Sequence, residues 1–208
     1  MEAISSKHLL TNLLLIFASS FATLCADTAI QRPHQEPSTV FIRTSCSSTT
    51  YPRLCYSSLV RHAELIQTNR VLLTGAALNV TLASAKSTAA VVSMMAKRQE
   101  LKPREVAAMK DCVEVLSDSV DELRRSIDGM THLRTSNFEM TMSDVQTWVS
   151  AALTDENTCT DGFQESATAA AAAIAGTNTK TRVRGLVVQV AQLTSNALAL
   201  INQLANQG

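Results

Sequence analysis

The chain has 208 residues, with 18 basic and 18 acidic side chains and therefore a net charge of zero. Only 17% of its residues are charged, so the composition lacks the basic surface of a nucleic-acid-binding protein. Aromatic residues make up only 4%, which disfavours a β-sheet protein, whereas abundant alanine and leucine favour helices.

The N-terminus is typical of a secretory signal peptide. Lys7 and His8 precede an apolar run over residues 9–24, and small residues follow it. A membrane anchor is the alternative, but polar residues dilute the run. We expect residues 1–26 to be removed, with the cut between Ala22 and Ala29. No later segment is expected to be long and apolar enough to span a membrane, which predicts a secreted protein with no membrane partner.

Cleavage would remove Cys25 and leave an even number of cysteines. In an oxidising compartment four thiols imply two disulfides. Cys46 and Cys55 bracket eight residues that contain turn-forming residues, so we expect these two to be joined. That leaves Cys112 to pair with Cys159. The spacings are not those of a zinc site, and we expect no metal or other cofactor.

Four segments carry apolar residues at alternating steps of three and four, the pattern of a helix that packs along one face. Short polar connections separate them, which is typical of antiparallel neighbours. The residues of the four stripes are Val71, Gly75, Leu78, Leu82, Ala85, Ala89, Val92 and Ala96; Val106, Met109, Val113, Leu116, Val120, Leu123, Ile127 and Met130; Phe138, Met142, Val145, Val149 and Ala152; and Val183, Leu186, Val190, Leu193, Ala197, Leu200 and Leu204.

Local signals set the boundaries of these helices. Pro103 suits a first helical turn. Gly129 and the polar residues 131–137 are expected to separate the second helix from the third, and residues 176–180 the third from the fourth. A capping box at Ser143 and Gln146 is one candidate start for the third helix, although the stripe permits an earlier start. Cys112 and Cys159 are equidistant from residues 135 and 136, inside the 131–137 turn, as a disulfide between antiparallel helices requires.

The sequence therefore predicts an all-α protein. Residues 69–206 are expected to form an up-down-up-down four-helix bundle, and residues 39–68 a disulfide-linked helical hairpin that precedes it. Together they make one domain, 39–206, after a flexible tail at residues 27–38. Whether the hairpin packs on its own bundle or on a neighbouring molecule is left open.

No catalytic constellation is evident. Three histidines of the mature chain, His34, His62 and His132, are far apart in this scheme, and the sequence has no nucleophile elbow and no H-E-x-x-H motif. We therefore expect a binding protein and not an enzyme.

Four segments, in this order and with matching cysteines, resemble the plant invertase and pectin methylesterase inhibitor family. The resemblance implies the same four-helix bundle, hairpin and disulfides, and a secreted protein of the cell wall. The segments are the Cys46 to Cys55 hairpin with the following Y-S-S-L, MKDCVEVLSDSVDELRRS (109–126), DVQTWVSAALTDENTCTDGF (144–163) and QLTSNALALIN (192–202).

The details favour the pectin methylesterase branch of the family. S-A-A-L-T at residues 150–154 and the S-N-A-L-A-L-I ending are similar to that branch, and the Pro-Lys-Phe element of invertase inhibitors is missing. The expected partner is pectin methylesterase, in a 1:1 complex that blocks its active-site cleft and limits pectin de-esterification. Acid invertase of the cell wall or vacuole is the alternative target. A secreted helical bundle that signals through a receptor is the alternative of another class.

The resemblance also implies which residues bind the target enzyme. In such inhibitors the second and third bundle helices cover the enzyme's groove, and acidic residues after the third cysteine make polar contacts. The matching residues here are Glu114, Asp118, Asp121, Thr158 and Asp161. A proton shared between Asp118 or Asp161 and a carboxylate of the enzyme would make binding tighter at mildly acidic pH.

The sequence also contains a glycosylation sequon, Asn79-Val80-Thr81. It lies inside the first predicted bundle helix, beside the stripe residue Leu78, so Asn79 is a candidate glycosylation site that this position could shield from modification.

Overall fold

A computed structural model describes residues 36–97, 103–163 and 177–207. The expected leader and most of the expected tail lie outside these ranges. Every regular element of the described part is helical, which confirms the all-α class. The elements are α2 (Pro37–Cys46), α3 (Pro52–Leu59), the 3-10 turn η1 (Val60–His62), α4 (Ala63–Ile66), α5 (Arg70–Ala96), α6 (Pro103–Thr131), the 3-10 turn η2 (Thr135–Asn137), α7 (Phe138–Asp161) and α8 (Thr177–Ala205).

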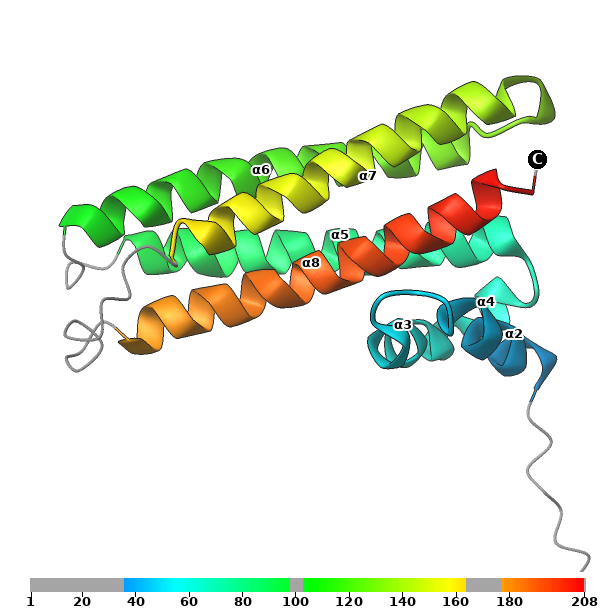
Figure 1. The fold of residues 1–208 in the computed structure, drawn as a ribbon, viewed down its shortest axis with the longest axis horizontal. Coiled ribbons are helices and arrows are strands. Elements are labelled where there is room, and N and C mark those ends of the chain that lie inside the picture. Colours follow the sequence, from blue (N-terminus) through cyan, green and yellow to red (C-terminus); the bar gives the residue numbers. More distant parts are fainter. Residues whose placement is uncertain (1–35, 98–102, 164–176, 208) are drawn as a thin grey trace, which may run out of the picture. The chain divides into compact units, whose positions relative to one another are not determined.

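The four long helices form the antiparallel bundle (Figure 1). Around the bundle α5 packs against α6 and α8, and α7 packs against α6 and α8. Successive helices therefore run up and down, as the short connections predicted. The α6–α7 pair, on which the candidate binding residues lie, forms one side of the molecule.

The predicted stripes form the core of this bundle. On α6 the side chains of Met109, Leu116 and Leu123 are at most 1% exposed, and on α8 six of the seven stripe residues are buried. The stripes fail only at their ends, where Val71 and Val106 are 37% exposed. Val71 and Val106 both lie in the first turn of their helix, α5 and α6 respectively.

The core consists of two apolar clusters along the bundle. One surrounds the Cys112–Cys159 disulfide, and the other contains Val149, Leu200 and the residues under the hairpin. Between the clusters α7 places Glu156, which is completely buried, at the next step of its apolar stripe. A carboxyl at a core position must be hydrogen-bonded or protonated, and its partners are described below.

Gly129 was expected to separate two helices, but α6 continues through it to Thr131. The glycine instead allows close packing: a Cβ at this position would lie 3.1 Å from Val145 Cγ2 and 3.3 Å from Trp148 Cζ3. Gly129 is therefore an interhelical contact of α6 with α7 and not a helix end.

Two other predicted boundaries need correction. The capping box at Ser143 is wrong, because α7 begins at Phe138 and Ser143 lies inside it, as the stripe had permitted. The boundary expected at residues 176–180 is wrong as well, because α7 already ends at Asp161 and α8 includes Thr177 to Lys180.

The hairpin packs on the bundle of its own chain, against α5 and α8 (Figure 1). The Cys46–Cys55 disulfide joins α2 to α3. Asn196 of α8, 3% exposed, makes two hydrogen bonds to the hairpin backbone: its Nδ2 donates to the carbonyl of Tyr51 at 3.0 Å, and its Oδ1 accepts from the amide of Tyr51 at 2.9 Å. This paired contact anchors the loop between α2 and α3.

Helix α8 corrects the expectation that no segment after the leader is long and apolar enough to span a membrane. Its segment Thr179–Ala205 is long and apolar enough to cross a membrane by length and composition alone. In the bundle, however, its apolar side chains Val183, Val187, Val190 and Ile201 are completely buried against the other helices. The apolar character of α8 is therefore that of a core helix.

Candidate binding face

The Cys112–Cys159 disulfide sets the register of the two helices that carry the candidate binding residues. It joins α6 to α7 across a Cα–Cα distance of 4.5 Å. Both cysteines are buried, at 2% and 3% exposure, among apolar side chains that include Met109 and Phe163. The pairings Cys46–Cys55 and Cys112–Cys159 are those expected from the sequence.

All five candidate binding residues are exposed. Glu114 follows Cys112 by two residues, and Thr158 and Asp161 flank Cys159, so the disulfide brings these three close along the helix pair. Asp118 and Asp121 lie one and two turns further along α6. The structure therefore places all five on the two helices that the disulfide joins.

The side chains of Thr158 and Asp121 each contact a residue of their own helix. The hydroxyl of Thr158 donates to the carbonyl of Thr154 at 2.8 Å, so its lone pairs remain available as hydrogen-bond acceptors. Asp121 forms an exposed ion pair with Arg124, one turn along α6. Because exposed ion pairs contribute little, this one mainly orients the carboxylate.

Next to Asp118 the structure reveals two carboxyls that the sequence interpretation did not select, Glu122 of α6 and Asp155 of α7. Their side chains share a hydrogen bond across the helix pair. Partial burial, followed by the charge and hydrogen bond of Asp155 and the charge of Asp118, raises the pKa of Glu122 to about 7. Burial and the charge of Asp118 raise the pKa of Asp155 as well. Glu122 therefore holds the shared proton and donates it toward Asp155.

Beneath this pair lies the buried Glu156. Its Oε1 accepts a hydrogen bond from the hydroxyl of Ser119 at 2.8 Å and another from that of Thr194 at 2.9 Å, so it joins α6, α7 and α8. Within the described residues Oε2 has no hydrogen-bond partner. Burial raises the pKa of Glu156 to about 7, the two hydroxyl hydrogen bonds lower it, and the charges of Asp155 and Glu122 raise it again.

Three carboxyls with raised pKa values thus lie under and between the exposed acids of the α6–α7 pair. Glu122 and Glu156, whose pKa values are about 7, begin to lose their protons near neutral pH, so the negative charge of this face increases with pH. The face offers rigid hydrogen-bond acceptors but no nucleophile with an adjacent base. Within the described ranges no three histidine, cysteine or acidic side chains are grouped to hold a metal ion.

One sequence signal could have found these carboxyls. Steps of four and three from Val149 and Ala152 lead to Glu156 and then Cys159, so a glutamate occupies a core position. In addition, if Cys112 is opposite Cys159 in an antiparallel pair, residues 118–122 lie opposite residues 149–153. Asp155 is therefore expected two residues from the position opposite Asp118, although its contact with Glu122 also depends on how the two helices are rotated.

Comparison with known proteins places this arrangement in a family. Residues 40–200 match the family model described as plant invertase/pectin methylesterase inhibitor. Pectinesterase inhibitor 10 of Arabidopsis thaliana is 46% identical over 169 residues, which are 80% of this chain and 51% of that protein, so the chain spans about half of this relative. Pectinesterase inhibitor 9 of the same plant is 44% identical over 181 residues, 84% of this chain and 85% of the relative.

A solved structure agrees in fold. The crystal structure of a mutant form of a pectin methylesterase inhibitor from Arabidopsis superposes with a TM-score of 0.60 at 21% identity, over 77% of this chain and 95% of that one. At this identity the likeness concerns the helical architecture alone. The family is one of inhibitor proteins and not of enzymes, in agreement with the absence of a catalytic motif from the sequence. The chain therefore belongs to the plant invertase/pectin methylesterase inhibitor family.

Proposed function

We propose that this protein is secreted into the cell wall and inhibits pectin methylesterase, in a 1:1 complex in which the α6–α7 pair covers the enzyme's active-site cleft. One observation carries the proposal: Glu114, Asp118, Asp121, Thr158 and Asp161 are all exposed on two helices that a disulfide holds in register. The names of the relatives, pectinesterase inhibitors, support the choice of target.

A preformed face suits an inhibitor because binding does not have to order it. The α6–α7 pair is fixed by the disulfide, by the Glu156 hydrogen bonds and by the close contact at Gly129. Rigid surfaces of this kind avoid the entropy cost that flexible segments incur on binding. A standard interface buries about 1,600 Å² in total, so the five residues form only its polar part.

Charge is expected to make binding depend on pH. The Glu122–Asp155 pair beside Asp118 holds a proton that it loses as the pH approaches neutrality. If the enzyme presents carboxylates to this face, repulsion then grows with pH. We expect a lower dissociation constant at about pH 5 than at about pH 7.5, with a smaller difference for Glu122→Gln. Equal constants at the two pH values for the native protein would contradict this part of the proposal.

The face is tested by removing three carboxylates from it and three from elsewhere. The triple variant Glu114→Ala, Asp118→Ala and Asp121→Ala is expected to lose inhibition of pectin methylesterase by at least tenfold, since truncating several polar contacts of one interface commonly costs more than about 1.4 kcal/mol. The control variant removes the exposed carboxylates of Glu64, Glu139 and Asp144. It should inhibit like the native protein. Equal inhibition by both variants would reject the α6–α7 face.

The choice of target is tested with the native protein alone. Inhibition of pectin methylesterase but not of acid invertase supports the proposal, and the reverse result would assign the chain to the invertase branch. A protein that inhibits neither enzyme would favour the receptor-binding alternative. Recovery of the protein from cell-wall fluid of plant tissue, with residues 1–26 removed, tests secretion.

A further inference from the structure

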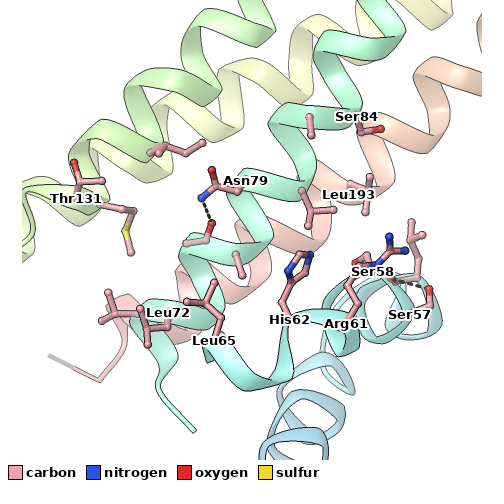
Figure 2. Close-up of a pocket in the computed structure, with 18 of the residues that line it drawn as sticks. Ser57, Ser58, Arg61, His62, Leu65, Leu72, Asn79, Ser84, Thr131 and Leu193 are labelled. Atoms are coloured by element: carbon pink, nitrogen blue, oxygen red, sulfur yellow. Dashed lines mark hydrogen bonds between the residues drawn. The ribbon is translucent and has the colours of Figure 1, made fainter. Parts of the chain in front are cut away.

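A groove lies between the hairpin and the bundle (Figure 2). It has a volume of about 900 Å³, and α3, η1 and α4 form one wall while α5, with the ends of α6 and side chains of α8, forms the other. The groove exposes apolar side chains that a protein in water normally covers: Leu65 is 61% exposed and Leu72 is 41% exposed.

Asn79, the first residue of the sequon, lies in the α5 wall of this groove (Figure 2). Its side chain is exposed, and one N–H of its Nδ2 donates to the carbonyl of Gly75 at 2.8 Å. An asparagine amide has two N–H bonds, so the second remains for a glycosidic linkage without loss of this hydrogen bond. The hydrogen bond also fixes the direction of the side chain along the groove wall.

The other half of the sequon indicates when the modification occurs. Thr81 is 1% exposed, and its hydroxyl donates to the carbonyl of Ala77 at 2.8 Å. A transferase that must recognise this hydroxyl can reach it only before α5 forms. The chain would therefore be modified as it enters the secretory pathway, and the folded helix would then carry the product.

We propose that Asn79 carries an N-linked glycan whose first sugars lie in the groove between α5 and the hairpin and cover Leu65 and Leu72. The glycan comes from a lipid-linked oligosaccharide pyrophosphate. Nδ2 attacks C1 of the first sugar, the bond from C1 to the pyrophosphate oxygen breaks, the lipid pyrophosphate leaves with that electron pair, and the amide loses one proton. The inference rests on the proposed secretion of the chain, but not on its inhibitory activity.

The chemistry of the groove suits a carbohydrate. Sugar rings have apolar C–H faces and N-acetyl methyl groups that pack on leucine side chains, and their hydroxyls need hydrogen-bond partners. On the wall opposite Asn79 the groove provides Arg61, His62 and Ser57 (Figure 2). Because the glycan is covalently attached at the wall, its local concentration in the groove is high, and weak contacts are enough to hold it there.

A glycan at this place would leave the proposed binding face free. The groove contacts α6 only from Ile127 to Thr131, and Ile127 is 15 residues after Cys112. Asp121, the nearest residue of the proposed face, is six residues before Ile127, which is roughly 9 Å along the helix and about 120° around it, whereas the disulfide is roughly 22 Å away. The glycosylated protein should therefore inhibit its target like the unmodified one.

The test compares the chain secreted by plant cells with the same mature chain made without glycans in bacteria and oxidised. Intact-mass measurement and peptide mapping are expected to show a glycan on Asn79 of the secreted chain, its loss in Asn79→Gln and its retention in Thr81→Ser, which keeps the sequon. An unmodified Asn79 in the secreted chain would overturn the proposal, whatever the inhibitory activity of the protein.

The place of the glycan is tested by acylation of histidines with diethyl pyrocarbonate. His62 lines the groove, whereas His132 is exposed in the turn before α7 and serves as the internal control. We expect modification of His62, relative to His132, to be several-fold slower in the glycosylated protein than in the unmodified one. Equal rates in both forms would show that the sugars point into solvent. Protection of His62 in an unmodified protein that elutes as a dimer would assign the groove to a second copy and likewise overturn the proposal.

Discussion

Replacing Glu156 by glutamine tests the role of the buried carboxyl. Burial raises its pKa from 4.5 to about 7, so the folded protein binds this proton more tightly than the unfolded chain does. The free energy of unfolding therefore falls as the pH rises through this interval and is lowest above it. With these two pKa values the loss between about pH 5 and pH 8 is about 2.5 kcal/mol.

The glutamine variant should not show this loss. Its amide is neutral at every pH, and its oxygen can still accept from Ser119 and Thr194, which now donate to Glu156 Oε1. Urea unfolding of both proteins between pH 5 and pH 8, with the disulfides intact, measures the difference. We expect Glu156→Gln to exceed the native protein by less than about 1 kcal/mol at pH 5 and by about 3 kcal/mol at pH 8.

A control on the same helix separates this effect from general changes in charge. Glu139 is exposed in the first turn of α7, and Glu139→Gln should leave the pH dependence of unfolding like that of the native protein. If the profiles of Glu156→Gln and the native protein run parallel across the range, the carboxyl does not titrate between the two pKa values, and the reasoning from its burial is refuted.

Four further variants test the packing of the bundle and of its hairpin. Gly185→Ala should raise the free energy of unfolding by up to about 1 kcal/mol, because its Cβ would meet nothing within 4 Å. Gly129→Ala should lower the melting temperature, because its Cβ would lie 3.1 Å from a methyl group of Val145. Equal shifts of the melting temperature in the two variants would contradict this reasoning. Replacing Cys112 and Cys159 together by alanine should cost about 4 kcal/mol in urea unfolding, since their disulfide closes a loop of about 48 residues, and a cost near zero would show that the bundle sets the register without it. Asn196→Ala should destabilise the hairpin by about 1 to 3 kcal/mol, seen as faster amide exchange in residues 47–51 than in α7, and unchanged exchange there would show that the paired hydrogen bonds do not anchor the loop.

The architecture could be predicted from the sequence because heptad spacing, turns and cysteine positions all point to one bundle. Apolar residues such as Leu116 and Leu123 recur at regular steps, and this spacing indicates a helix with one buried face without any knowledge of how its side chains pack. The errors arose where packing decides the outcome: glycine disfavours helices by propensity, yet Gly129 lies inside α6, where a Cβ would be in tight contact with Val145 and Trp148.

Only part of the candidate site could be predicted, because sequence spacing places residues along a helix but does not give the contacts between helices. The five candidate residues could be placed on α6 and α7 from their spacing to the cysteines, and the structure shows each of them exposed. The Glu122–Asp155 pair needed the relative rotation of two helices, which spacing along one chain does not give. Glu156 looked like one more charged residue near Asp155, because charged side chains are rarely buried.

The contacts of Glu156 and of the hairpin give a structural reason for the segment QLTSNALALIN (192–202), one of the four that resemble the family. Three consecutive residues of α8 each bind a different part of the molecule: Thr194 donates to Glu156, Ser195 donates to Thr50 of the hairpin loop at 3.2 Å, and Asn196 pairs with Tyr51. This segment therefore connects α8 both to the polar layer of the core and to the hairpin. A substitution there affects two interfaces at once.

The disulfide connects α7 to α6 alone, whereas Glu156 of α7 accepts hydrogen bonds from both α6 and α8. The disulfide holds α7 to α6 at every pH, whereas the hydroxyl of Thr194 holds α8 to Glu156 beside an oxygen, Oε2, that is buried without a partner in the described structure. When Glu156 ionises, the cost of its buried charge is relieved most readily by water entering on the side of α8, because the disulfide restrains the other side. Above neutral pH, amide exchange should therefore accelerate in α8 before it does in the α6–α7 pair. The proposed binding face would then keep its register under conditions that already loosen the rest of the bundle.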